Sequence, residues 1–237
     1  MSNETCCPIV ELRQYTLVPG GREVLISLFE RHFIESQEAT GMTVIGQFHD
    51  LNNLDRFVWL RGFSDMNSRA RQLQKFYGGP IWKEHREAAN ATMIDSDNVL
   101  LLRPAHTNSG FRLENLKRPP HASKGNSNGL VVATIYYLAG SVDSFVEVFK
   151  TEVMPALTNA GATMLATFVT ETHPNTFPAL PVRECENVFV AFSRVSDRET
   201  HLQHTPSFAA PPSRKQSTLV KKLETLLLAP TGRSLLR

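Results

Sequence analysis

A short polar run near the start of the chain carries the side chains best suited to chemistry. Glu11, Arg13 and Tyr15 alternate within the segment 9–17, so they lie on one face of a β-strand. An arginine can hold an anion and a tyrosine can donate a hydrogen bond, while a buried glutamate and arginine compensate each other's charge. The pattern predicts either a structural ion pair or an anion-binding, proton-handling site beside Tyr15.

A histidine supplies the base that such a site would need. His49 ends the segment 43–49, which alternates like a second strand, and an imidazole titrates near neutral pH. A histidine at a strand end is also a common solvated turn residue. The candidate catalytic residues are therefore Arg13 as anion holder, Tyr15 as hydrogen-bond donor and His49 as base.

Aromatic and cationic residues elsewhere could complete a binding site. Trp59 and Arg61 share one face of a strand predicted over 56–63. The loop 170–186 contains three prolines, which stiffen it into a lid or a dimer-contact arm. The candidate substrate-binding residues are Glu11, Trp59, Arg61, Trp82, Phe177 and Arg183.

Several kinds of site leave no trace in the sequence. We find no glycine-rich phosphate loop, no His-Glu-x-x-His zinc motif and no serine-nucleophile elbow. We therefore expect no metal and no cofactor, with His85 as an axial haem ligand the weaker alternative. Cys6, Cys7 and Cys185 are an odd number without a secretory signal, so we expect reduced thiols.

Composition narrows the class of protein. The 237 residues include 25 basic and 23 acidic residues, a net charge of +2 that is too even for a nucleic-acid-binding surface. No apolar run approaches the roughly 20 residues that a membrane span needs. The polar N-terminus carries no signal-peptide core. We expect a cytoplasmic protein that binds neither nucleic acid nor membrane.

The first half reads as strand, helix, two strands, helix, strand. The expected strands are 9–17, 43–49, 56–63 and 97–103, and the expected helices run from about Val24 to Gln37, over 65–75, and from Ile81 to about Met93. Gly78-Gly79-Pro80 separates the last two helices. Residues 105–128 are rich in Ser, Asn, Pro, Gly and Lys and read as a linker.

The second half repeats this order. Its expected strands are 130–138, 163–169, 187–195 and 226–228, with helices around Phe145–Val153, after Ser196-Asp197, and over 214–225. Gly41 and Gly161 lie 120 positions apart, as do Phe29 and Phe149. We infer a duplication with domains at 8–104 and 129–237, the longer loop 170–186 being an insertion in the second copy.

Two such β-α-β-β-α-β units predict an α+β fold of two tandem ferredoxin-like domains that form an α+β barrel. The barrel could close within one chain or between two chains, and we expect a homodimer. Because helices should cover the more apolar face of the first strand, Glu11, Arg13 and Tyr15 are expected to point into the barrel interior.

The first half resembles the NIPSNAP family within the dimeric α+β barrel group. The residues that carry the resemblance are Glu11-Leu12-Arg13-Gln14-Tyr15, Leu17, Pro19-Gly20, Trp59, Arg61, Asp65, Arg69, Arg71, Pro80, Trp82 and Leu100-Leu101-Leu102-Arg103-Pro104. It covers residues 8–104 well and 129–230 more loosely. The resemblance implies the fold firmly and the function poorly, since related barrels include cofactor-independent monooxygenases, isomerases and haem-linked enzymes.

Two functions remain open at this level. One is a cofactor-independent enzyme, of the monooxygenase or isomerase type, acting on a small aromatic or carbonyl compound in the barrel cavity. The other is a non-catalytic scaffold that binds a small molecule, haem or another protein. A large cavity lined by Glu11, Arg13, Tyr15 and Trp59 favours the first, and a barrel filled with side chains favours the second. Any site is expected where the first copy's sheet meets the loop 170–186.

Overall fold

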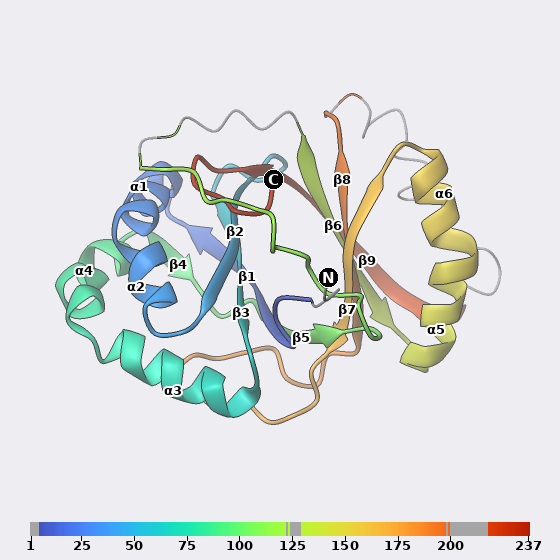
Figure 1. Ribbon diagram of the computed structural model, residues 1–237, viewed down its shortest axis with the longest axis horizontal. Coiled ribbons are helices and arrows are strands. Elements are labelled where there is room, and N and C mark those ends of the chain that lie inside the picture. The colour runs from blue at the N-terminus through green and yellow to red at the C-terminus, as the bar shows by residue number, and fades with distance from the viewer. Residues whose placement is uncertain (1–4, 122, 124–128, 198, 200–217) are drawn as a thin grey trace.

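The computed structural model describes residues 5–121, 123, 129–197, 199 and 218–237 (Figure 1). Strands from both halves of this part of the chain join in one antiparallel sheet, and eight of them close a barrel in the order β1-β3-β2-β9-β6-β8-β7-β5 and back to β1. The strands are β1 (Ile9–Leu17), β2 (Thr43–Asp50), β3 (Arg56–Phe63), β4 (Met93–Asp95), β5 (Val99–Pro104), β6 (Leu130–Leu138), β7 (Thr163–Thr170), β8 (Val188–Val195) and β9 (Val220–Pro230).

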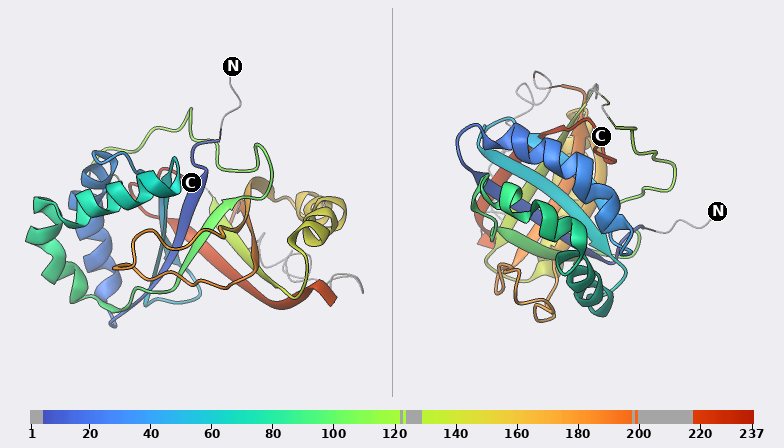
Figure 2. Two further views of the ribbon diagram at one scale, coloured as in Figure 1. Left: turned by 90° about the horizontal axis from the view of Figure 1, so that it is seen from below. Right: turned by 90° about the vertical axis from the view of Figure 1, so that its left-hand side faces the viewer.

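Helices cover the barrel on two opposite sides (Figure 2). The first half supplies α1 to α4 and the second half supplies α5 and α6, with a π-helical segment inside the first helix of each half. The bounds are α1 (Gly21–Leu28), η1 (Phe29–Phe33), α2 (Ile34–Glu38), α3 (Met66–Tyr77), α4 (Pro80–Asn90), α5 (Val142–Val148), η2 (Phe149–Val153) and α6 (Met154–Asn159). No helix in the described residues is long and apolar enough to cross a membrane.

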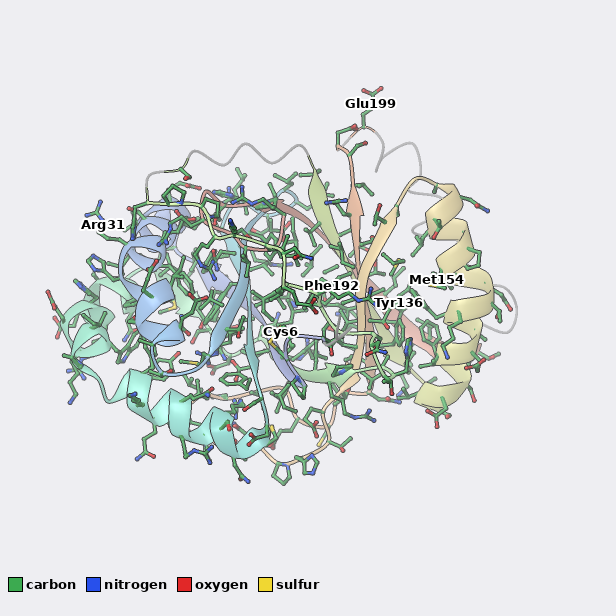
Figure 3. All side chains as sticks on the ribbon, viewed as in Figure 1. Cys6, Arg31, Tyr136, Met154, Phe192 and Glu199 are labelled. Atoms are coloured by element: carbon green, nitrogen blue, oxygen red, sulfur yellow. A yellow bond between two sulfur atoms is a disulfide. The ribbon has the colours of Figure 1, made fainter. Side chains whose placement is uncertain are left out.

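Apolar side chains from all eight barrel strands fill the interior. Val10 and Leu12 of β1 meet residues such as Ala133 and Ile135 of β6 there, and Phe192 of β8, labelled in Figure 3, lies in the same cluster. These side chains are almost fully buried. The barrel is therefore a packed core that both halves build together, and it closes within a single chain.

The predicted direction of the polar face of β1 is wrong. Glu11, Arg13 and Tyr15 alternate with the interior residues Val10 and Leu12, so they point outward, beneath the helices of the first half. Strands of both halves line the barrel interior, and the apolar face of each strand serves it best. The polar face lies instead in the layer between sheet and helices.

Most predicted elements appear close to their expected bounds. The strands 9–17, 56–63 and 130–138 are those of the structure, and Gly78-Gly79-Pro80 does separate α3 from α4. The helix predicted over 214–225 is wrong from Val220 onward, because β9 pairs there with β6 along Val220–Leu228. Residues 214–217, and the helical stretch expected around Pro206 and Pro211-Pro212, lie outside the described residues.

Local irregularities recur at one spacing. The π-helical segments begin at Phe29 and Phe149, 120 positions apart. The β2–β3 and β7–β8 ladders both shift register at matching places, between Val44 and Gly46 and between Met164 and Ala166. Such bulges and π-segments are specific departures from regular geometry, so their recurrence is stronger evidence of correspondence than shared element order.

The N-terminal cysteines also differ from expectation. Cys6 and Cys7 form a disulfide between adjacent residues, so the prediction of reduced thiols is wrong for this pair, while Cys185 is a free, exposed thiol. Cys7 is buried against the barrel interior because Gly62 of β3 leaves room for it. A Cβ atom at Gly62 would overlap Cys7 Sγ and lie 2.5 Å from Cys7 Cβ.

This close approach makes Gly62 sensitive to a single added methyl group. We expect Gly62→Ala to lower the free energy of unfolding by about 1–3 kcal/mol, because the overpacked strand or the cysteine pair must shift. Gly140→Ala is the matched control, since its added Cβ meets its nearest neighbour, Leu219, at an ordinary 3.6 Å. Urea denaturation of both variants measures the difference; equal stabilities would contradict the packing described here.

Candidate functional site

One buried carboxylate binds three arginines between the sheet and the helices of the first half. Glu11 Oε2 accepts hydrogen bonds from Arg13 Nη1 and from Arg61 Nε, each at 2.7 Å. Glu11 Oε1 accepts one from Arg69 Nε, also at 2.7 Å. All four side chains are at most 1% exposed. The cluster therefore holds two more positive charges than negative ones.

Three elements bring these charges together. Glu11 pairs directly with Arg61 in the β1–β3 ladder, and Arg13 lies one step along the same face. Arg69 comes from α3, whose start is fixed by Asp65: the Asp65 carboxylate accepts a hydrogen bond from the Ser68 backbone N–H at 2.7 Å. The N-cap thus sets which helical residues face the sheet.

The electrostatics of the cluster favour the charged carboxylate. Burial by itself would raise the pKa of Glu11, but attraction to Arg61, Arg13 and Arg69 outweighs it and holds that pKa well below its usual range. Burial lowers the pKa of Arg69, with Glu11 opposing the shift. One carboxylate cannot neutralise three guanidinium groups, so the layer between sheet and helices has a strongly positive potential.

The remaining nitrogen atoms are only partly satisfied. Arg61 Nη1 donates to Gln37 Oε1 at 3.1 Å, and Arg69 Nη1 donates to Asn175 Oδ1 at 2.9 Å. The Nη2 atoms of Arg61 and Arg69 are buried without a hydrogen-bond partner in the described part of the chain. Unpartnered buried donors of this kind mark a place that suits an acceptor or an anion.

Tyr15 joins the cluster to a small cavity. Its hydroxyl oxygen accepts a hydrogen bond from Arg13 Nε at 2.9 Å, and burial raises the pKa of Tyr15, so the phenol keeps its proton at neutral pH. The cavity has a volume of about 30 Å³, enough for roughly one water molecule. Trp59 also lines it, and the buried Trp59 Nε1–H has no acceptor among the described residues.

Aromatic rings form the walls of this cavity. Trp82 packs against Phe33, Phe76 and Tyr77 at centroid distances of 4.9–5.9 Å. Phe177, from the loop that follows β7, stacks on Tyr77 at 6.1 Å. The Arg13 and Arg61 guanidinium groups lie 5.6 and 5.0 Å from the Trp59 ring centroid, a cation–π arrangement.

The structure brings most of the predicted residues together and leaves two apart. Glu11, Arg13, Tyr15, Trp59 and Arg61 form one cluster, with Trp82 and Phe177 at its aromatic wall. His49 is partly exposed at the end of β2, where its Nε2 lies 3.0 Å from Glu23 Oε1. Arg183 donates to the Tyr137 hydroxyl at 2.9 Å, on β6 of the second half.

Sequence reasoning missed Arg69 as a site residue. Arg69, Leu73 and Phe76 are spaced four and three residues apart, so they share the buried face of α3. A charged residue on an apolar helical stripe was the available signal, because arginine is rarely buried without a partner. Gln37, Tyr77 and Asn175 gave no comparable signal, since their roles depend on long-range contacts.

The second half does not repeat this cluster. By the pairing of the matching strands, Val132 and Thr134 occupy the positions of Glu11 and Arg13. Ala191 occupies the position of Trp59. Tyr136 corresponds to Tyr15, but it lies in an apolar layer, where burial raises the pKa of its phenol and keeps that group neutral. The polar site therefore belongs to one half.

The candidate haem ligand His85 packs against His32 and Phe33. The centroids of the His32 and His85 rings are 3.8 Å apart with the planes tilted by 32°, and the Phe33 centroid is 6.3 Å from that of His85. Among the described residues, no group of three or more His, Cys, Asp or Glu side chains could hold a metal ion. The residues of the cluster suit a ligand held by hydrogen bonds and charge.

Comparison with known proteins identifies the family. The NIPSNAP family profile matches residues 10–108. A NIPSNAP-like domain protein of uncharacterised function from Burkholderia xenovorans is 32% identical over 40% of this chain and 84% of its own, with a TM-score of 0.38. The chain belongs to the NIPSNAP family. The profile covers the half that carries the arginine cluster.

Solved structures extend the likeness in fold to both halves of this NIPSNAP protein. A provisionally assigned monooxygenase from Lactobacillus acidophilus NCFM covers 96% of this chain and 94% of its own, at 16% identity and a TM-score of 0.53. An anthrone oxidase-like protein covers 98% and 94%, at 11% identity and a TM-score of 0.56. At these identities the likeness shows the fold alone. No curated protein matches the chain.

Replacing the central carboxylate tests the electrostatics of the cluster. We expect Glu11→Gln to lower the free energy of unfolding by about 3–5 kcal/mol at pH 7, because it leaves three buried guanidinium groups without a counter-charge. Glu87→Gln, on the exposed face of α4, is the matched control and should change stability little.

The stability difference between wild type and Glu11→Gln should also depend on pH in a defined direction. Glu11 has a lowered pKa in the folded protein, so its stabilising contribution is complete above the unfolded-state pKa of about 4.3 and is lost as the pH falls toward the folded pKa. The stability difference between wild type and Glu11→Gln should therefore shrink between pH 5 and pH 3. A difference that is constant over this range in urea denaturation would contradict the assignment.

Proposed function

We propose that this NIPSNAP protein binds a small aromatic or carbonyl-bearing molecule beneath the helices of its first half and acts on it as a cofactor-independent enzyme of the monooxygenase or isomerase type. The observation that carries the proposal is the pairing of two donors without an acceptor among the described residues, the Tyr15 hydroxyl proton and Trp59 Nε1–H, with a buried excess of two positive charges. Donors and fixed positive charge at one place suit a carbonyl oxygen that becomes negative.

The two reaction types share one chemical requirement. Each can begin with loss of a proton from the substrate, which leaves an enolate or phenolate. The Arg13, Arg61 and Arg69 charges are preorganised and shielded from water, so they would stabilise that anion strongly. In this proposal Arg13 holds the Tyr15 hydroxyl in place, and Tyr15 keeps its proton and donates a hydrogen bond to the negative substrate oxygen. His49 as the base stays a prediction.

Binding requires the aromatic wall to open. A cavity of about 30 Å³ is smaller than an aromatic ring, so the described conformation is a closed one for such a ligand. Trp82 of α4 is partly buried and lines the cavity, and Phe177, from the loop after β7, packs outside it on Tyr77. Movement of the Trp82 side chain would enlarge the cavity.

One observation favours the alternative, a non-catalytic binding or interaction scaffold. The barrel interior is filled with apolar side chains, and in the part of the chain that the structure describes the cavity beside Tyr15 and Trp59 holds only about 30 Å³. A NIPSNAP protein of this kind would use its surface rather than its interior. A ligand-binding panel followed by turnover assays separates the two functions.

We also infer that the chain consists of tandem ferredoxin-like units at 8–104 and 129–237, joined by the linker 105–128. The π-helical segments, the register shifts and the positive-φ glycines Gly41 and Gly161, each 120 positions apart, support this arrangement. Because the barrel closes within one chain, closure does not require a partner, and the homodimer stays a prediction.

A ligand panel tests the proposed site. Salicylate and benzoate, with salicyl alcohol as the neutral comparison and haemin as the haem probe, are followed by thermal shift. At about 100 times Kd an aromatic acid should raise Tm by about 5 °C or more, because binding to the folded state alone stabilises it. Tyr15→Phe should abolish the shift, while Tyr136→Phe, the corresponding tyrosine of the second half, should keep it.

Turnover is tested on the ligands that bind, and on an anthrone. Exchange of a substrate C–H for solvent deuterium, followed by NMR, reports the substrate anion, and an oxygen electrode reports oxygenation. Exchange or oxygen uptake that Tyr15→Phe reduces at least tenfold supports the enzyme. Saturable binding with neither activity would overturn the enzymatic part and favour the binding scaffold, and a flat thermal-shift panel would overturn the site itself.

A further inference from the structure

A second, larger cavity lies on the opposite side of the barrel from the arginine cluster. It has a volume of about 560 Å³ and runs between the α5–η2–α6 helix and β7, with linker residues at its rim. This size lies within the range of small-molecule sites. Its floor is apolar and includes two methionines, one of which, Met154, is labelled in Figure 3. The floor residues are Val146, Phe149, Met154, Met164, Leu165 and Phe189.

The corresponding slot of the first half is occupied by the chain itself. The C-terminal segment 231–237 runs beside β2 there, as the red trace near the label C in Figure 1 shows. The Thr231 backbone N–H donates to the Gln47 carbonyl and the Leu236 N–H donates to the Ile45 carbonyl, both at 2.9 Å. This segment closes the space between β2 and the first helix.

The linker begins the same path in the second half and then leaves it. The Ala105 N–H donates to the Thr167 carbonyl at 3.0 Å, which matches the Thr231 contact of the first half. Leu165 is the counterpart of Ile45, 120 positions on. Within the described part of the chain, no backbone hydrogen bond of the linker reaches Leu165. The open cavity is thus the slot that the C-terminal segment fills in the first half.

The charge of the two slots is opposite. In the first half Arg233 enters the slot, donates to the Glu30 carbonyl at 2.7 Å and pairs with the Glu35 carboxylate. Lys150 occupies the position of Glu30 in the second π-helical segment. Arg112 and His106 lie at the same rim. Lys150 shares its charge with exposed Glu147 at 3.2 Å, a weak surface pair.

We propose that this cavity binds a small aliphatic carboxylate, with its chain on the apolar floor and its carboxylate at Lys150 and Arg112. A basic arginine fills the acidic slot of the first half, so an acidic ligand is the electrostatic complement of the basic slot in the second. Met154 and Met164 adapt to chains of different shape, because the thioether side chain is flexible and polarisable. The site is independent of Tyr15 and of the proposed enzymatic function.

The test uses octanoate, with octan-1-ol and octylammonium as neutral and cationic chains of the same length, and isothermal titration calorimetry on the full chain. Wild type should bind octanoate saturably and at least tenfold more tightly than the other two. Lys150→Glu combined with Arg112→Glu should weaken octanoate about tenfold or more and should reverse the preference toward octylammonium. That gain of binding also shows that the variant is folded.

A matched control and two outcomes decide the proposal. Lys75→Glu combined with Lys83→Glu makes the same charge change on the exposed faces of α3 and α4, and Tyr15→Phe alters the other site; both should leave octanoate affinity unchanged. Equal affinity for octanoate and octan-1-ol, or charge reversal without effect, overturns the proposal. Binding of an acidic peptide in place of octanoate would also overturn it, in favour of a protein segment as the occupant.

Discussion

The burial of one carboxylate among three guanidinium groups is the interaction on which the first half of this protein depends. Glu11, Arg13, Arg61 and Arg69 come from two strands and a helix, and each loses its hydration in the folded state. Their mutual hydrogen bonds make that loss tolerable, so the strand register and the position of α3 must be right together. The cluster therefore ties the helix layer to the sheet as well as creating a positive site.

Because side chains fill the barrel interior, the candidate binding sites lie in the two layers between the sheet and the helices. The interior serves stability, because it is built from the apolar faces of the barrel strands of both halves. The layers between the sheet and the helices differ between the halves: one holds the arginine cluster, and the other carries uncharged residues at the matching positions, with Val132 in place of Glu11 and Ala191 in place of Trp59. The two halves thus differ in these side chains while both place helices over the same barrel sheet.

The same asymmetry appears where the ends of the chain are placed. Residues 231–237 complete the first half by filling the slot beside β2, and they do so through Arg233 on an acidic wall. In the second half, linker residues lie at the rim of the matching slot, which stays open and carries Lys150 on its wall. The two slots therefore differ in charge, and the acidic one holds a basic residue of the chain itself.

Sequence alone gave the family resemblance and most elements of the first half, because these depend on local periodicity and on glycine and proline breaks. The tandem repeat, inferred from matched spacing, stays a prediction. The sequence also grouped Glu11, Arg13, Tyr15, Trp59 and Arg61 correctly, since residues two apart on a strand share a face. The sequence did not predict the extent of β9. The residue pattern of Val220–Leu228 suits a helix, and the segment becomes a strand because β6 provides its hydrogen-bond partners.

Tertiary structure decided which face of β1 became the interior. The alternation of Val10 and Glu11 does not by itself say which side faces inward. The choice follows from the second-half strands, whose apolar residues Ala133 and Ile135 meet Val10 in the barrel interior. The same packing recruited Arg69 from a helix and Asn175 from a loop more than a hundred residues away. The sequence determined which residues stay together on a strand, and the fold determined what they face, because burial is a property of all the elements at once.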